Sequence, residues 1–130
     1  MKTFDFEKNI AILQDAKGKE IGWYGSHYPA YSTDIIVFAQ SYFKSDAYDR
    51  YFDRTLRQYG FREGIPEEKV AEIAKESDNY DLVRALMSAV IRGEKYTPGM
   101  WQVLVYNGIM LDLLVRQYQL KTNIQLAIDV

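Results

Sequence analysis

The fold of this 130-residue chain is decided by residues 82–93, Leu-Val-Arg-Ala-Leu-Met-Ser-Ala-Val-Ile-Arg-Gly. Apolar side chains recur there at the three- and four-residue spacing of an α-helix, and they form a surface wide enough to be buried on more than one side. Gly93 ends the pattern, as glycine commonly does after a helix. The stretch therefore predicts a central helix against which the rest of the chain packs.

Cap and breaker residues predict four helices before the central one. Aspartate, serine and threonine side chains accept hydrogen bonds from the free amides at a helix start, proline is favoured in the first turn, and glycine often follows the last turn. On these signals the helices begin after Asp5, at Ser32 or Thr33, at Asp46 and at Pro66, and the first and third end near Gly18 and at Gly60.

Two helices are expected after the central one. Thr97 is positioned to cap a helix whose first residue is Pro98 and which runs to the break at Asn107-Gly108. Residues 109–121 then have the pattern of a last helix.

Two other segments have the character of strands. Residues 20–25 combine glycine with aromatic side chains, and residues 124–130 alternate apolar and less apolar side chains. We expect these two segments to pair with each other. The prediction is a mainly α fold: a compact single domain over residues 1–130, a bundle of about six to seven helices with a minor two-stranded β element.

Composition limits the possible functions. Hydrophobic residues make up 48% of the chain and charged residues 26%, which is typical of a folded globular domain. The absence of cysteine excludes disulfides, thiolate metal sites and cysteine nucleophiles. A net charge of −2 gives no support to general polyanion binding. Without an apolar leader or an apolar run of about 18 residues, we expect a cytoplasmic protein that does not enter a membrane.

The C-terminal half carries a recognisable set of motifs. They are an arginine-alanine-leucine helix, an Arg-Gly-Glu-basic-aromatic turn, a Gly-x-Trp helix start and a final Gly-x-x-Leu-x-x-Leu helix. The matching positions are Arg84, Ala85, Leu86, Arg92, Gly93, Glu94, Lys95, Tyr96, Gly99, Trp101, Gly108, Leu111 and Leu114.

With these motifs the chain resembles a small bacterial and phage family of helical domains of unknown function. The resemblance covers about a third of the chain clearly, and Thr97-Pro98 departs from the small or acidic pair that is usual after the turn. It implies a helical fold and a bacterial or phage origin, and it implies no particular reaction.

The turn at Arg92, Glu94 and Tyr96 is one candidate site. Arg92 could clamp a carboxylate or phosphate with two hydrogen bonds, while Glu94 accepts a proton or orients the clamp. The structural alternative is an ordinary helix end, at which Arg92 meets the negative end of the helix dipole and Glu94 helps to cap the next turn. The sequence favours the structural alternative.

The aromatic segment before the second helix is the other candidate site. Aromatic residues reach 15% of the chain, with 11 tyrosines, and tyrosine and tryptophan are favoured at binding surfaces. The alternative is a loop that folds over the helices. The candidate patch for a protein partner or a stacked ligand consists of Trp23, Tyr24, His27, Tyr28 and Tyr31.

Catalytic and metal-binding groups are sparse. His27 is the only histidine, so one chain cannot supply a two-histidine metal site. Asp46, Asp49 and Asp53 share a helical spacing that could bind Mg²⁺, but neighbouring arginines favour an ion-paired surface. We predict no catalytic residue, no metal site and no cofactor.

The preferred hypothesis is a non-enzymatic interaction module of bacterial or phage origin, which binds a partner protein or itself through an aromatic surface. Three alternatives stay open. One is a small enzyme or ligand sensor with a pocket using Arg92, Glu94 and Tyr96, and another is a phage inhibitor of a host defence system. The third is a weak nucleic-acid binder using Arg84, Arg92, Lys95, Arg116 and Lys121.

Overall fold

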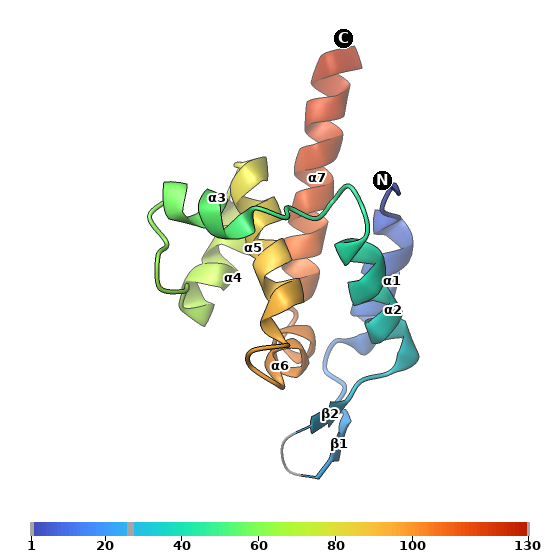
Figure 1. Ribbon diagram of the computed structural model, residues 1–130. Coiled ribbons are helices and arrows are strands. Elements are labelled where there is room, and N and C mark those ends of the chain that lie inside the picture. The colour runs from blue at the N-terminus through green and yellow to red at the C-terminus, as the bar shows by residue number, and fades with distance from the viewer. Residues whose placement is uncertain (1, 26–27, 130) are drawn as a thin grey trace.

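The computed structural model describes residues 2–25 and 28–129 (Figure 1). The described chain is mainly helical with one small two-stranded sheet, which confirms the predicted fold class. In chain order the elements are α1 (Phe6–Ala16), β1 (Gly22–Tyr24), β2 (Tyr28–Ala30), α2 (Thr33–Phe43), α3 (Phe52–Gln58), α4 (Glu67–Glu76), α5 (Tyr80–Gly93), α6 (Met100–Tyr106) and α7 (Ile109–Asp129).

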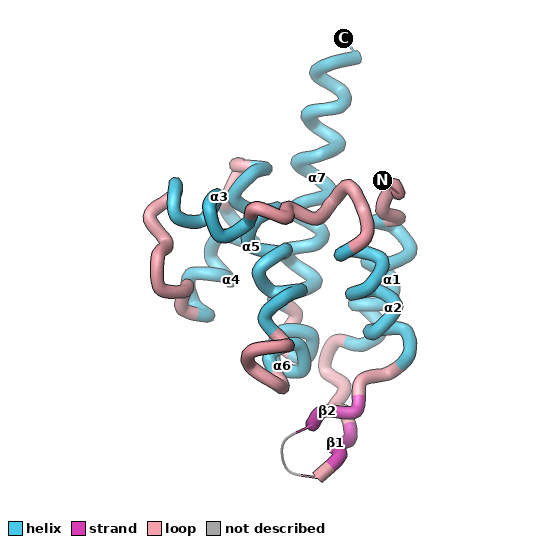
Figure 2. The backbone as a smooth tube through the Cα atoms, in the orientation of Figure 1, coloured by secondary structure: helices cyan, strands magenta, loops and turns pink. Residues whose placement is uncertain are grey.

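Helix α5 is the central helix, as the sequence predicts. It contacts α2, α3, α4, α6 and α7. Figure 2 shows α3 and α4 on one side of α5 and the pair α1 and α2 on the other side. Apolar side chains from both flanks of α5 are buried, and burial of this kind is the main driving force for the fold. The buried residues of α5 are Val83, Ala85, Leu86, Met87, Ser88, Val90 and Ile91.

Side-chain caps fix the starts of the first two helices where the sequence predicts them. The carboxylate of Asp5 accepts a hydrogen bond from the amide of Lys8, and the hydroxyl of Ser32 accepts one from the amide of Ile35. Each cap satisfies an amide that has no partner inside its own helix.

Helix α3 begins later than predicted, at Phe52 rather than Asp46. The guanidinium of Arg84 on α5 donates hydrogen bonds to the carbonyl oxygens of Asp46, Ala47 and Tyr48, at 3.2, 3.2 and 2.9 Å. The carboxylate of Asp46 accepts a further bond from the amide of Phe4. Tertiary contacts thus hold residues 46–48 in a non-helical course, against their local helix signals.

The predicted pairing of residues 20–25 with residues 124–130 is wrong. Strand β1 pairs with β2 in an antiparallel hairpin, with Gly22, Trp23 and Tyr24 opposite Ala30, Pro29 and Tyr28. Residues 124–129 continue α7 instead, and residue 130 lies outside the described residues.

Two physical reasons favour the observed arrangement. A strand partner a few residues away closes a much shorter loop than one at the far end of the chain. Adding a residue to an existing helix also costs less free energy than nucleating a new element. Consequently the apolar residues Ile124, Leu126 and Ile128 are exposed on the end of α7 that extends beyond the other helices (Figure 1). No helix among the described residues has the length and apolarity needed to span a membrane.

A buried hydrogen-bond chain ties three distant segments together. The hydroxyl of Tyr42 on α2 donates to the side-chain oxygen of Gln117 on α7 at 2.7 Å, and the amide group of Gln117 donates to the carbonyl of Ala47 at 3.1 Å. Tyr42 and Gln117 are both completely buried. Because each of these buried polar groups has a partner, the core avoids the penalty of an unsatisfied group.

Candidate functional site

Glu94 caps helix α6 from the turn before it. Its Oε2 accepts a hydrogen bond from the amide of Gly99 at 2.8 Å, and its Oε1 accepts one from the amide of Trp101 at 2.9 Å. A carboxylate is favoured here because the helix start carries partial positive charge. The predicted cap and start, Thr97 and Pro98, are wrong: the helix begins at Met100. Glu94 therefore has the structural role that the sequence favours for it.

Tyr31 joins this cap from the other half of the chain. Its hydroxyl donates to Oε1 of Glu94 at 2.8 Å and accepts a hydrogen bond from the amide of Gln102 at 3.0 Å. Its ring lies 5.4 Å from that of Trp101, whose indole NH donates to the carbonyl of Val90 at 2.8 Å. We call the unit formed by Tyr31, Glu94 and the first turn of α6 the latch.

Partial burial raises the pKa of the Tyr31 phenol well above its ordinary value, and the hydrogen bond to the Glu94 carboxylate raises it further. The phenol is therefore protonated across the physiological range. In that state it can keep donating to Glu94 while it accepts from Gln102.

Trp23 on β1 packs against Gly99, which directly precedes α6, and so holds the hairpin against the start of this helix. Gly99 has a φ of +95°, and a Cβ atom built there would lie 3.0 Å from Cη2 of the Trp23 ring. The backbone conformation therefore favours glycine, and the indole leaves little room for a Cβ atom. Although Trp23 keeps 47% of its surface exposed, one edge of its ring is held against the body of the protein.

Tyr24 and Tyr28 form what we call the hairpin tip. They lie directly opposite each other across the two strands, and they are 73% and 68% exposed. Successive side chains along a strand point to opposite faces, so this pair lies on the face away from Trp23 and Pro29. Figure 1 shows the hairpin beyond the helices, at the end of the molecule opposite the C-terminus.

Two of the candidate residues in the Arg92–Tyr96 turn have separate surroundings. The Arg92 guanidinium lies 5.1 Å from the centre of the Phe43 ring on α2, whereas Glu94 is bonded to α6 and Tyr31. Among the described residues, no hydrogen bond or ion pair joins Arg92 to Glu94. Tyr96 is exposed, with the Lys95 ammonium 5.9 Å from its ring. The structure thus places Glu94 in the latch and not in an anion clamp with Arg92.

The other candidate groups are divided between structural roles and the undescribed part of the chain. His27 lies outside the described residues. Asp49 accepts hydrogen bonds from the Tyr51 amide and the Thr55 hydroxyl, and Asp53 pairs with Arg57 at 2.8 Å. Within residues 2–25 and 28–129, no group of three or more acidic, histidine or cysteine side chains is arranged to hold a metal ion.

The basic residues proposed for nucleic acid are partly used by backbone contacts. The Arg84 guanidinium is bound to the three carbonyls described above, and Nε of Arg116 donates to the carbonyl of Ser77 at 2.7 Å. Lys121 lies 4.0 Å from a carboxylate oxygen of Asp46. These contacts use donors that phosphate binding would need.

Sequence reasoning missed the link between Tyr31 and the α5–α6 turn. It placed Tyr31 in an aromatic patch and Glu94 in a separate turn, because a hydrogen bond across 63 residues leaves no local pattern. The available signal was the Gly-x-Trp motif, because the amides of Gly99 and Trp101 both donate to Glu94 at the latch.

No protein-family model matches the chain, and neither a curated protein nor a solved structure shows significant similarity to it.

Proposed function

We propose that this chain is a non-enzymatic interaction module that binds a partner protein through the hairpin tip. The observation that carries the proposal is the pairing of two strongly exposed tyrosines, Tyr24 and Tyr28, on a hairpin that is anchored at both of its strands. Trp23 anchors the first strand on Gly99, and Tyr31 anchors the end of the second through Glu94.

Anchoring matters because it lowers the entropy lost on binding. A tyrosine has few rotatable bonds and a large amphipathic surface, which is why tyrosine is enriched among the residues that dominate binding energy. A hairpin of two three-residue strands would be marginal on its own. The latch gives it a fixed support, so the tip can be presented in one orientation.

The contacts of Glu94 and Arg92 favour a binding role over a catalytic one. The Glu94 carboxylate already accepts from two backbone amides and from Tyr31, and the Arg92 guanidinium lies over Phe43. A general base needs a carboxylate that is free to meet a substrate, whereas the Glu94 carboxylate is already bonded within the latch.

The test is photo-cross-linking from the hairpin tip. A photoreactive phenylalanine analogue replaces Tyr24, and in a control protein it replaces Tyr51, which is exposed on another part of the molecule. After irradiation in a bacterial lysate, the proposal expects a discrete protein adduct from position 24 that is absent from position 51. Adducts that are the same from both positions, or absent from both, would reject the hairpin tip as the binding surface.

Self-association is a second candidate, and one observation favours it. Ile124 and Ile128 lie one turn apart on α7, and both are exposed at the end that extends past the other helices. A second copy could cover this apolar stripe through a two-fold interface. Sedimentation equilibrium tests this: self-association predicts a dimer that Ile124→Lys with Ile128→Lys converts to a monomer and that Tyr24→Ala leaves intact. A wild-type monomer at high concentration would reject it.

A further inference from the structure

An apolar groove lies between α3, α4, α5 and α6, apart from the latch contacts of Glu94 and Tyr31. Its volume is about 390 Å³. Its floor is made by buried side chains, namely Leu56, Val70, Leu86, Val90 and Leu104. The partly buried Ile65, Ala89 and Met100 and the exposed Val103 form its walls. A concave apolar surface of this volume falls in the range of small-molecule sites.

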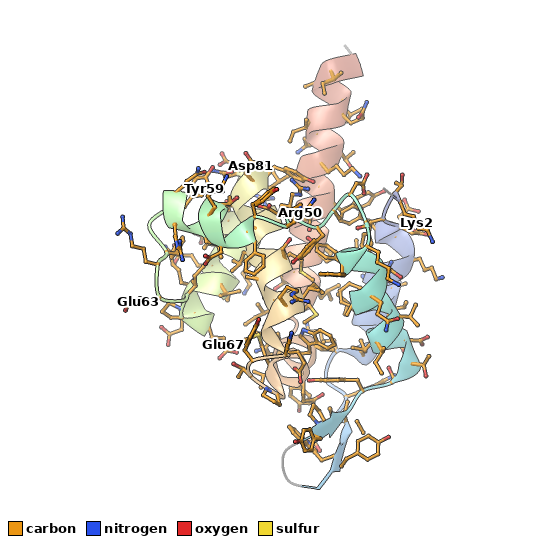
Figure 3. The ribbon with its side chains drawn as sticks, in the orientation of Figure 1. Lys2, Arg50, Tyr59, Glu63, Glu67 and Asp81 are labelled. Carbon is orange, nitrogen blue, oxygen red and sulfur yellow. The ribbon has the colours of Figure 1, made fainter. Side chains whose placement is uncertain are left out.

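One charged side chain lies at the mouth of the groove. Among the residues that line the groove, Glu67 is the only charged one and Thr97 is the only other with a polar side chain. Figure 3 labels Glu67, the first residue of α4, whose side chain is exposed. A ligand that fills the groove therefore meets apolar atoms over most of its surface and one exposed carboxylate.

Two successive hydrogen bonds position the Glu67 carboxylate. Its Oε1 accepts a hydrogen bond of 2.6 Å from the side-chain NH₂ of Asn107, and the side-chain oxygen of Asn107 accepts a bond of 3.0 Å from the amide of Ile109. These two hydrogen bonds fix the orientation of the Asn107 side-chain amide and, through it, the position of Oε1 of Glu67. Within the described residues, Oε2 of Glu67 makes no hydrogen bond, so it can accept one from a ligand.

We propose that this groove binds a small, mainly apolar molecule of about two fused rings that carries a protonated amine at one end. The size follows from the volume, because a cavity of about 150 Å³ holds one benzene molecule and this groove is more than twice as large. The charge of the head group follows from Glu67, because a cation complements the single carboxylate at the mouth. This inference does not depend on the hairpin tip.

The test uses three probes with one ring system. They are 2-(2-naphthyl)ethylamine, 2-(2-naphthyl)ethanol and 2-naphthylacetic acid, which are cationic, neutral and anionic at neutral pH. Each is titrated into protein with labelled Ile, Leu and Val methyl groups at low salt. The proposal expects saturable shifts at Ile65, Val70 and Val103, no shifts at Leu13 and Ile124, and a Kd for the amine about two- to five-fold lower than for the acid. The modest ratio reflects an ion pair that solvent reaches.

Matched variants separate the apolar and charged parts of the site. Glu67→Gln should remove the difference between amine and acid, while Glu68→Gln, an exposed neighbour outside the groove lining, should preserve it. Ala89→Phe should fill the groove and abolish binding of all three probes. If that variant does not fold, Val103→Lys, at an exposed wall position, should weaken the amine at least as much as Glu67→Gln does.

Three results would overturn the proposal. The first is no saturable binding of the amine at millimolar concentration. The second is an acid that binds as tightly as the amine, or an amine preference that survives Glu67→Gln. The third is a change of the groove methyl signals on dilution without any probe, which would show that a second copy of the chain occupies the groove.

Discussion

The hydroxyl of Tyr31 lies 2.8 Å from Oε1 of Glu94, although 63 residues separate the two in the chain. This hydrogen bond connects the segment after β2 to the turn between α5 and α6. Because the same carboxylate caps α6 and the same hydroxyl accepts from the amide of Gln102, hairpin and helix share one network. The stability of the latch should therefore depend on both side chains together.

Substitution of Glu94 tests the latch directly. Glu94→Ala leaves the amides of Gly99 and Trp101 and the Tyr31 hydroxyl without their acceptor. We expect a loss of about 1–3 kcal/mol in the free energy of unfolding, measured by urea denaturation. The control Glu20→Ala, at an exposed position, should change it by less than about 0.5 kcal/mol. Equal losses in the two variants would contradict the capping role.

Combining Tyr31→Phe with Glu94→Ala tests whether the two side chains act as a unit. Residues in one hydrogen-bond network usually show an interaction energy of about 0.5–3 kcal/mol. Once Glu94 is absent, the Tyr31 hydroxyl has lost its acceptor, so removing it should cost less than it does in the wild type. Strictly additive losses in a double-mutant cycle would show that the hydrogen bond contributes nothing.

Alkaline pH should destabilise the protein. Burial is the largest cause that raises the pKa of both Tyr31 and Tyr42, so each phenol loses its proton more readily in the unfolded chain than in the folded protein. Their stabilising contribution is complete below the ordinary tyrosine pKa of about 10 and is lost as pH rises beyond it. Denaturation between pH 8 and 11 should show a steeper loss in the wild type than in Tyr31→Phe or Tyr42→Phe. Identical slopes would contradict the raised pKa values.

Gly99→Ala tests the contact between Gly99 and the Trp23 ring, which holds the hairpin against α6. Alanine at a φ of +95° is strained, and its Cβ would press on the Trp23 ring. We expect a loss of at least about 1–2 kcal/mol and a red shift of tryptophan emission as Trp23 leaves its seat. Gly22→Ala is the matched control in the same hairpin, because a Cβ atom added there would meet no other atom within 4 Å and the φ of Gly22 is not positive. An unchanged free energy of unfolding and an unchanged emission in Gly99→Ala would show that Trp23 does not pack against Gly99.

Two positions on α7 should respond very differently to substitution. Leu113 is completely buried, so Leu113→Ala should cost about 2–5 kcal/mol through lost contacts and the cavity left behind. Ile128 is exposed on the extended end, so Ile128→Lys should change the free energy of unfolding of the monomer by less than about 0.5 kcal/mol. A large loss from Ile128→Lys would indicate that the end of α7 is covered in solution.

Local signals in the sequence were sufficient for much of the helical framework. Asp5 and Ser32 cap their helices because a cap needs only an acceptor and the amides three residues later. The width of the apolar surface in residues 82–93 likewise predicts that α5 is central. Such features depend on neighbours within one or two turns, which the sequence displays directly.

One error is local, because Glu94 rather than Thr97 caps α6. The other errors concern contacts between distant segments. Asp46 carries a helix-start signal, but Arg84 binds the carbonyls of residues 46–48, and the helix begins only at Phe52. Alternating residues 124–130 have the pattern of a strand, but residues 124–129 lie at the end of a helix that simply continues. In the candidate site, the roles of Trp23 and Tyr31 depend on Gly99 and Glu94, and no spacing rule connects residues so far apart.

The most direct test of the central claim is the affinity of the cross-linked partner, once purified, for three forms of the protein. These are the wild type, the double variant Tyr24→Ala with Tyr28→Ala, and the control Tyr51→Ala, and calorimetry gives the Kd of each. Because exposed aromatic anchors dominate many interfaces, we expect the double variant to bind at least about ten-fold more weakly while the control binds like the wild type. An unchanged Kd for the folded double variant would contradict binding through the hairpin tip.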